Sequence, residues 1–289
     1  MKLVNGYKLM EYAKEKKLVL PAFNTTNFEL TKSIVQGYNA MGLGGYIEVS
    51  SNNLKLSSPE MIAEMVEFCM KDTDTPIALH LDHGKSFEDV KACIDAGFTS
   101  IMVDASYLPF EENVKEVQRT VEYCHYFNIP VEAELGAISG KEDDHVVEGA
   151  GKTNPDDVRE FVELTKCDTL AVSVGNVHGM ALSPNLDFPL LEKVSKESSV
   201  PLVLHGGSGI PFDQVRRAKE FNLIKVNFGA DLRQAYIKTF GKAYEEDHNA
   251  FDMFGLSKDA VVNVEDRVKA IITEVNLKWN KNSFPVDYI

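Results

Sequence analysis

The chain has 289 residues, of which 44% are hydrophobic and 26% charged, values typical of a globular protein with a sizeable core. Its formal net charge of −14 argues against general binding to nucleic acid or to an anionic membrane, because both need a basic surface. An anionic substrate is still compatible with that charge, since a local group of backbone N–H donors can bind it. The four cysteines form no Cys-x-x-Cys pair, and no run resembles a signal peptide or a membrane span. We therefore expect a cytoplasmic protein with reduced thiols.

Short β-branched runs alternate with amphipathic stretches along the chain. A helix is expected first, over residues 5–17. Eight strands are then predicted, at residues 19–24, 44–50, 76–82, 100–106, 130–136, 169–175, 201–207 and 223–229. Strand–helix alternation repeated eight times favours an α/β fold of the (β/α)₈ TIM-barrel type, and the main alternative is a doubly wound open sheet.

No linker or low-complexity segment divides the chain, so we expect one domain over residues 1–289. The glycine-rich, acidic stretch of residues 137–153 is long for a loop inside a compact domain, and such loops are often functional lids. A helical tail is expected beyond the barrel, over about residues 256–289.

Polar residues gather where the predicted strands end, which is where barrel enzymes build their active sites. These residues are Asn24, Ser50, Asp82, His83, Asp104, Glu134, His178, His205 and Asn227. A barrel without a site at its rim would show only a scatter of such groups. The sequence therefore predicts a catalytic site at the carboxyl ends of the strands.

Three histidines at these ends, His83, His178 and His205, are each followed by glycine. Three imidazoles that leave one position open are typical of catalytic zinc, although other divalent ions also suit them. His80 shares a strand face with Asp82, so we expect it to support the site from behind. Asp104 is expected to anchor a metal ligand or to bind an auxiliary, monovalent cation.

The motifs "LHLDHG", "VEAELG", "NVHG" and "LHGGSGIP" occur in this order along the chain. On these motifs the chain resembles the class II, metal-dependent ketose-bisphosphate aldolases, which act on fructose or tagatose 1,6-bisphosphate, and the resemblance covers essentially its whole length. It implies that His83, His178 and His205 bind zinc, with Glu134 as an alternative or nearby ligand. It also implies a homodimer or homotetramer.

The resemblance further implies the catalytic roles. Asp82 would exchange the proton of the C4 hydroxyl, Glu142 in the lid would handle the proton at C3, and Asn227 would hold the enediolate. Cleavage beside a ketone produces this anion, and an open metal site stabilises it as a Lewis acid. The candidate contacts to substrate or phosphate are Asn24, Ser50, Gly179, Gly206, Gly207, Ser208 and Gly229.

The phosphate-binding segments depart from the family pattern. Residues 180–182 are Met-Ala-Leu where members commonly carry a lysine, and Ala230 follows Gly229 where they carry a threonine. The stretch "VSSNNLKLSS" also differs from the usual Ser-Glu-Gly-Ala run. Two substrate classes therefore stay open. One is a ketose 1,6-bisphosphate cleaved to dihydroxyacetone phosphate and an aldehyde. The other is a different ketose that is singly phosphorylated, unphosphorylated or otherwise anionic.

Three further hypotheses need different residues. A Schiff-base aldolase would use a lysine, and Lys225 is the only lysine in a predicted strand. A zinc barrel hydrolase usually takes its first ligands from a His-x-His on strand one, where this chain reads "AFNTTN". A non-catalytic sugar-phosphate sensor would need no acid–base pair, yet Asp82 and Glu142 are both present.

Overall fold

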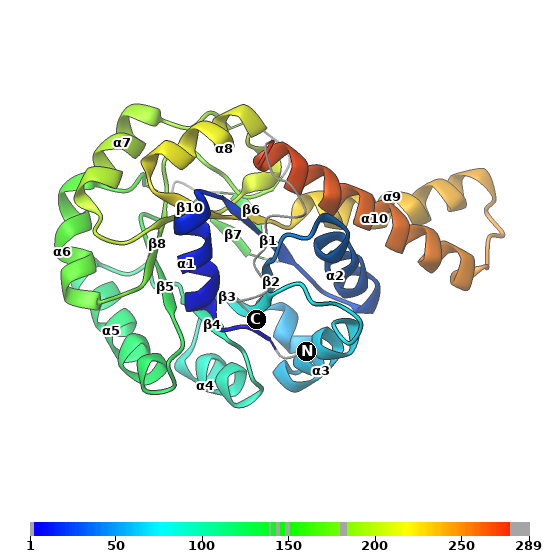
Figure 1. The fold of residues 1–289 in the computed structure, drawn as a ribbon, viewed down its shortest axis with the longest axis horizontal. Helices are drawn as coiled ribbons and strands as arrows, with labels where there is room; N and C mark the ends of the chain where they lie inside the picture. The colour runs from blue at the N-terminus through cyan, green and yellow to red at the C-terminus, as the bar shows by residue number, and fades with distance from the viewer. Residues whose placement is uncertain (1–2, 139, 143–144, 148–150, 180–183, 278–289) are drawn as a thin grey trace.

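The computed structural model describes residues 3–138, 140–142, 145–147, 151–179 and 184–277. Eight parallel strands close into a barrel in the order β1-β10-β9-β8-β5-β4-β3-β2 (Figure 1). They are β1 (Leu20–Asn24), β2 (Gly45–Ser50), β3 (Ile77–Gly84), β4 (Ser100–Val103), β5 (Val131–Leu135), β8 (Thr169–Val172), β9 (Leu202–Leu204) and β10 (Leu223–Phe228). All eight predicted strands are present, and the predicted TIM barrel is confirmed.

Helices surround the barrel, as expected when each parallel strand is covered on its outer face. They are α2 (Phe28–Met41), α3 (Pro59–Cys69), α4 (Phe87–Asp95), α5 (Phe110–Tyr126), α6 (Pro155–Thr165), α7 (Phe188–Glu197) and α8 (Phe212–Ala218), with short 3₁₀ turns η1 (Asn53–Lys55), η2 (Gly207–Gly209) and η3 (Lys219–Phe221). Side-chain caps set several of their starts. Ser86 Oγ, for example, accepts a hydrogen bond from the Asp89 N–H at 3.0 Å. None of the helices in the described ranges is long and apolar enough to cross a membrane.

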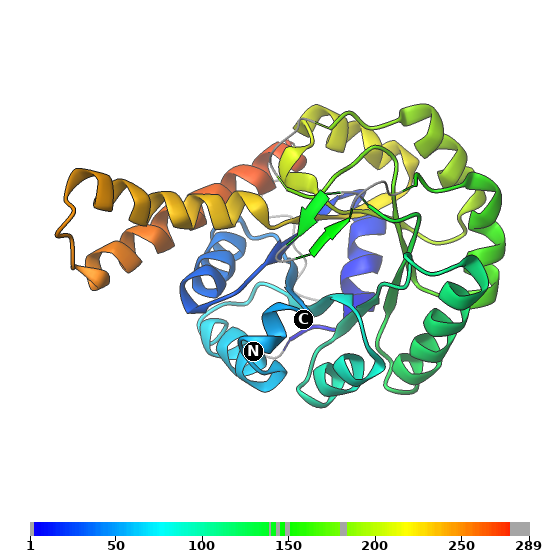
Figure 2. The same ribbon diagram turned by 180° about the vertical axis from the view of Figure 1, so that it is seen from behind.

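The two ends of the barrel are covered differently. Helix α1 (Gly6–Lys16) lies across the end where the strands begin, because the Val4 and Gly6 amides donate to Ile77 and Thr99 carbonyls at 2.9 and 3.0 Å. A hairpin of β6 (Gly140–Glu142) and β7 (His145–Val147) lies in front of the other end in Figure 2, with α1 behind. This hairpin falls inside the predicted lid of residues 137–153.

Helices α9 (Ala230–Glu246) and α10 (Met253–Val275) form a pair that projects from the barrel (Figures 1 and 2). Part of α10 packs closely on α2, where a Cβ at Gly37 would lie 2.4 Å from Val268 Cγ1. The helical tail predicted from about residue 256 therefore begins at Met253, the first residue of α10. Helix α9, which follows the last barrel strand, packs beside α10. Residues 278–289 of that tail lie outside the described residues.

Candidate active site

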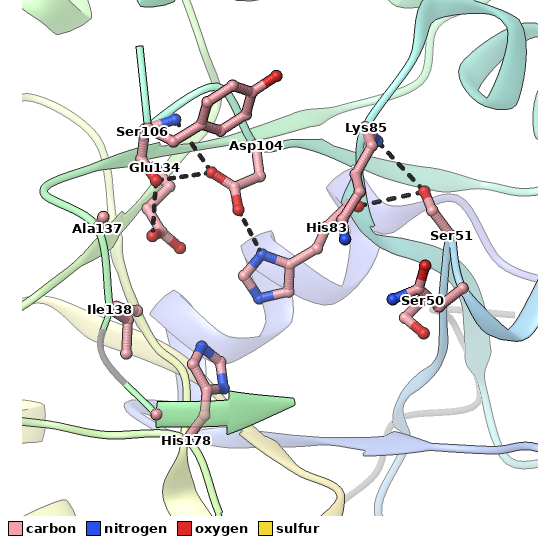
Figure 3. Close-up of a pocket in the computed structure, with 13 residues that line it drawn as sticks. Ser50, Ser51, His83, Lys85, Asp104, Ser106, Glu134, Ala137, Ile138 and His178 are labelled. Carbon is pink, nitrogen blue, oxygen red and sulfur yellow. Dashed lines mark hydrogen bonds and ion pairs between the residues drawn. The ribbon is translucent and has the colours of Figure 1, made fainter. Parts of the chain in front are cut away.

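A pocket opens at the carboxyl ends of the strands, where the sequence predicted the site (Figure 3). Its lining comes from the ends of β2, β3, β4 and β5 and from the loop after β8. In Figure 3 the rings of His83 and His178 point into the same space, with Asp104 and Glu134 on one side and Ser50 and Ser51 on the other. Ser50, predicted to contact substrate, lines this pocket, and its Oγ accepts from the Asn53 amide at 3.4 Å.

A bulge at the end of β3 brings two consecutive residues into the site. On a regular strand Asp82 and His83 would point to opposite faces. Here β3 pairs with β4 in register up to Leu81, and the register shifts before Gly84. His83 takes up a left-handed backbone conformation at φ 46°, which is uncommon for a residue other than glycine. The bulge thus re-aims His83 toward the barrel mouth beside Asp82.

The three predicted metal-binding histidines converge. His83 Nε2 lies 2.8 Å from His205 Nδ1. The ring of His178 lies edge-on to both, with centroids 5.3 Å from His83 and 6.0 Å from His205. One ring nitrogen from each histidine lies within 4.8 Å of the other two. The residues of three different strand ends therefore provide a three-imidazole site of the kind that holds catalytic zinc.

Two carboxylates, one beside His83 and one beside His205, fix the tautomers of these two histidines. Asp104 Oδ2 lies 2.8 Å from His83 Nδ1, and Glu132 Oε1 lies 2.9 Å from His205 Nε2. A carboxylate only accepts hydrogen bonds, so these two ring nitrogens carry the protons. The nitrogens that face each other then present lone pairs 2.8 Å apart. A cation bound between these nitrogens would relieve that repulsion, and three imidazoles are a donor set that suits zinc. The site residues therefore fit a divalent metal ion.

A buried charge cluster lies behind His205 inside the barrel. Lys225 Nζ contacts Glu132 at 3.0 Å, Glu48 at 3.5 Å and His80 Nε2 at 3.3 Å. Burial alone would lower the pKa of Lys225, but Glu132 and Glu48 outweigh it and raise the pKa above its usual value. His80 Nδ1 bonds to Ser100 Oγ at 2.8 Å, so His80 supports Lys225 rather than a metal-binding histidine. A lysine held protonated in an ion pair is a poor Schiff-base nucleophile.

Replacing Glu132 by glutamine is expected to weaken zinc binding by about 10–100-fold, as loss of a group that orients a metal-binding histidine typically does. Glutamine removes the charge that holds the Nε2 proton of His205 and pairs with Lys225. Competition titration against a chromophoric chelator measures the affinity. Glu48→Gln is the matched control, because it also takes a carboxylate from Lys225. Equal zinc affinity in both variants would contradict the prediction.

Asp104 and Glu134 form a second acidic group beside His83, and oxygen or nitrogen atoms of the three lie within 4.8 Å. Burial would raise the pKa of Asp104, but hydrogen bonds from His83 and Ser106 outweigh it, so the pKa is lowered. Burial and the charge of Asp104 raise the pKa of Glu134 well above its usual value. The hydroxyl of Ser106 lies between the two carboxyl groups, 2.8 Å from Asp104 Oδ1 and 3.1 Å from Glu134 Oε1. His83, Asp104 and Glu134 form a second group that could hold a metal ion, so a role for Glu134 as an alternative or nearby ligand stays a prediction.

Asp82 is held by two amide side chains. Asn24 Nδ2 donates to its Oδ2 at 2.8 Å and Asn227 Nδ2 donates to its Oδ1 at 3.1 Å, and all three residues are buried. His83 Nε2 lies 4.0 Å from the same carboxylate. The amide oxygens of Asn24 and Asn227 have no hydrogen-bond partner among the residues that the structure describes. Such buried acceptors are suited to the hydroxyl groups of a polyol.

The candidate phosphate contacts follow three neighbouring strands, β8, β9 and β10. They are Gly179, Gly206, Gly207, Ser208 and Gly229. Gly206 has a left-handed φ of 68°, and a Cβ there would lie 2.1 Å from the Val177 carbonyl oxygen, so only glycine lets these two loops meet. Ser208 Oγ accepts from the Asp231 N–H at 3.1 Å, at the start of α9. The structure thus brings these residues to one part of the mouth.

Two predicted features are described only in part. Glu142 ends β6, but its side chain lies outside the described residues, as do residues 180–183. The backbone of the same hairpin reaches the site, because Gly140 forms a bridge with His178. Sequence reasoning missed Glu132 and the pairing of Asn24 with Asp82. The even spacing of Glu132 and Glu134 on one strand was the available signal, since such residues share a face.

Comparisons with known proteins identify the family of this chain. The family model described as "Fructose-bisphosphate aldolase class-II" matches residues 4–279. The fructose-bisphosphate aldolase of Geobacillus stearothermophilus is 38% identical over 268 residues, which are 90% of this chain and 93% of that protein. That of Staphylococcus aureus strain Mu50 is 37% identical over 278 residues, 95% of this chain and 97% of its own.

Solved structures of aldolases are also similar to this chain. The YdjI aldolase from Escherichia coli K12 superimposes with a TM-score of 0.83 at 28% identity, covering 95% of this chain and 97% of that one. Fructose-bisphosphate aldolase from Campylobacter jejuni, at 19% identity and a TM-score of 0.80, shares the fold over 96% of this chain and 97% of its own. The chain therefore belongs to the class II fructose-bisphosphate aldolase family, and it is a class II aldolase, an aldehyde-lyase of a family that implies a divalent metal ion.

Proposed function

We propose that this chain is a zinc-dependent aldolase that reversibly cleaves a ketose 1,6-bisphosphate, of the fructose or tagatose type, into dihydroxyacetone phosphate and an aldehyde. The observation that carries the proposal is the placement of Asp82 beside the converging nitrogens of His83 and His205. Cleavage next to a ketone needs one group to take the proton of the C4 hydroxyl and another to stabilise charge on the ketone oxygen. This site supplies both.

Each residue of the site has its own role in the proposed reaction. Asp82, oriented by Asn24 and Asn227, accepts the C4 hydroxyl proton as the C3–C4 bond breaks. Asn227 holds the enediolate oxygen, and Glu142 on the hairpin returns a proton to C3. The hairpin β6–β7 at the mouth excludes water while the anion exists. When bound at His83, His178 and His205, the metal ion supplies Lewis-acid stabilisation of the developing charge.

A second substrate class is favoured by one specific observation. Residues 180–182 and Ala230 lack the lysine and threonine that the family commonly places around a phosphate. Charge-assisted hydrogen bonds are the strong ones, so their loss should weaken binding of that phosphate. The alternative is therefore an aldolase of the same chemistry for a ketose with one phosphate, none, or another anionic group.

A panel of ketoses tests the proposal. Zinc-loaded enzyme is assayed for cleavage of fructose and tagatose 1,6-bisphosphates, fructose 1-phosphate, fructose 6-phosphate and free fructose. We expect the highest kcat/KM with a bisphosphate. Negligible turnover of every bisphosphate beside clear turnover of another ketose would replace the proposal by the alternative. Cleavage of no ketose together with intact binding would instead favour a sugar-phosphate sensor.

Several finer statements stay predictions. They are zinc as the metal in the cell, an auxiliary monovalent cation at Asp104, a homodimeric or homotetrameric assembly, a single domain and a cytoplasmic location. Metal analysis of the purified protein and sedimentation velocity measure the metal and the assembly.

A zinc barrel hydrolase fits less well, because β1 ends in Asn24 bonded to Asp82 rather than in a pair of histidine ligands.

A further inference from the structure

A second cavity lies on the face of the barrel where the strands begin, opposite the active site. It is bordered by the end of α1, by α8 with the η3 turn, and by the start of β10 (Figure 1). Its volume of about 480 Å³ is within the range of small-molecule pockets. Leu18, Leu223 and Ile224 are buried and form an apolar floor. The cavity therefore combines the size of a ligand pocket with an apolar base.

The rim of this cavity is basic, although the chain as a whole is acidic. Carboxylates outnumber basic residues by 44 to 30 in the sequence, yet Glu220 contributes the only carboxylate to the part of the lining that the structure describes. The basic residues of the lining are Lys14, Lys17, Arg216 and Lys219. Four positive charges around one hollow repel each other, and a bound anion would remove that repulsion.

The two lysines of the rim that belong to the end of α1 are available to a ligand. Lys14 and Lys17 are both exposed, and within the described ranges neither forms an ion pair with a carboxylate. The neighbouring Lys16, by contrast, bonds to Glu15 at 2.6 Å. The end of α1 thus supplies two positive charges that no described side chain neutralises.

Arg216 is held at the cavity by the end of α10. Its Nη1 donates to the Glu274 carbonyl oxygen at 2.6 Å and lies 3.4 Å from Glu274 Oε2. A guanidinium group has five N–H donors in a planar fork, so these contacts leave donors that match a phosphate. The arginine is therefore oriented before a ligand binds, while the lysines add flexible point charges.

We propose that this cavity binds a small polyanion that also has an apolar part, of the nucleoside polyphosphate class. The phosphates contact Lys14, Lys17 and Arg216, and the base covers the apolar floor. A sugar phosphate has no apolar part that could cover this floor, whereas every nucleobase has a flat π-face. The inference goes beyond the proposed function, because this ligand is bound at the end of the barrel away from the metal-binding histidines.

Calorimetry with the zinc-loaded enzyme tests the proposal, with ATP as the probe in excess Mg²⁺ so that the nucleotide does not remove zinc. Lys17→Gln should raise the Kd about 3–10-fold, as expected for loss of a charged contact at an exposed site. The double variant of Lys14→Gln and Lys17→Gln should raise it further. Lys166→Gln is the matched control, because Lys166 is exposed and ends α6 in the same left-handed conformation, φ 58° against 53° for Lys17, but lies outside the cavity.

Glu220→Gln keeps the proposal falsifiable if a lysine variant folds poorly. It removes the carboxylate of the described lining, so it should lower the Kd of ATP about 2–5-fold, and a folding defect would not tighten binding. Equal Kd values for Lys17→Gln and Lys166→Gln, or weaker binding by Glu220→Gln, would overturn the inference.

Three further measurements identify the ligand and its place. Tripolyphosphate carries the phosphates without a base, and adenosine carries the base without phosphates. We expect ATP to bind more tightly than tripolyphosphate, and adenosine to show no measurable binding. Equal Kd values for ATP and tripolyphosphate would reject the nucleoside class in favour of inorganic polyphosphate. The Kd of ATP should not change in saturating dihydroxyacetone phosphate, and competition between the two would place ATP in the active site and overturn the inference.

Discussion

Replacing Asp82 by asparagine is expected to lower kcat by about 10² to 10⁴-fold, the usual contribution of a positioned acid–base group. Asparagine has almost the same shape but cannot accept the C4 hydroxyl proton. The two amides that hold Asp82 place its carboxylate 4.0 Å from His83 Nε2, beside the nitrogens that would hold the metal ion. A coupled assay of the preferred ketose measures kcat.

Two further measurements separate a chemical from a structural effect of this change. Zinc content and the Kd of dihydroxyacetone phosphate should stay within about twofold of wild type, because the predicted metal ligands are three histidines and Asp82 is not one of the ligands. Asp95→Asn, at the exposed end of α4, serves as the matched carboxylate control. If Asp82→Asn kept the turnover of this control, the acid–base role would be assigned to the wrong residue.

Removing the metal ion is the second change with a large expected effect. Dialysis against a chelator should lower activity by at least about 10³-fold, because Lewis-acid stabilisation supplies several kcal/mol to the reaction. Zinc should restore it, and it should also raise the Tm, since a ligand that binds only the native state stabilises it. His83 Nε2 and His205 Nδ1 face each other at 2.8 Å, so a cation bound between them is expected to stabilise the site.

The same experiment separates metal from Schiff-base chemistry. A Schiff-base aldolase keeps its activity in a chelator and loses it to borohydride in the presence of substrate. We expect the opposite here, because Lys225 is buried and paired with Glu132 and Glu48. Full activity after removal of all bound metal would reject the metal-dependent mechanism.

Most of the fold could be predicted from the sequence, because the signals are local. Parallel strands buried on both faces read as short apolar runs, and the amphipathic stretches between them read as helices. The eight strands and helix α1 lie where these patterns place them. The hairpin β6–β7 could not be predicted in the same way, since its three-residue strands are too short to show a period.

The residues of the site were predictable as a set, but their contacts were not. Polar groups at strand ends share one rim in any such barrel, which brought His83, His178 and His205 together. Which carboxylate faces which imidazole depends on register and on the bulge at the end of β3. Glu132 was missed for this reason, because nothing local to its strand shows that His205 lies 2.9 Å away.

The sequence by itself determined the barrel, the histidine set and Asp82, because each depends on the type and order of residues along single strands. Only the tertiary structure decided what these groups face. It brought Arg233 over Gly229, closed the chain of contacts from Asp104 through two histidines to Glu132, and buried Lys225 between two carboxylates. Apart from Arg233 and Gly229, which are neighbours along the chain, these contacts join residues from 21 positions apart (His83 and Asp104) to 177 positions apart (Glu48 and Lys225). The distance between such groups is set by strand register and loop packing rather than by neighbouring residues.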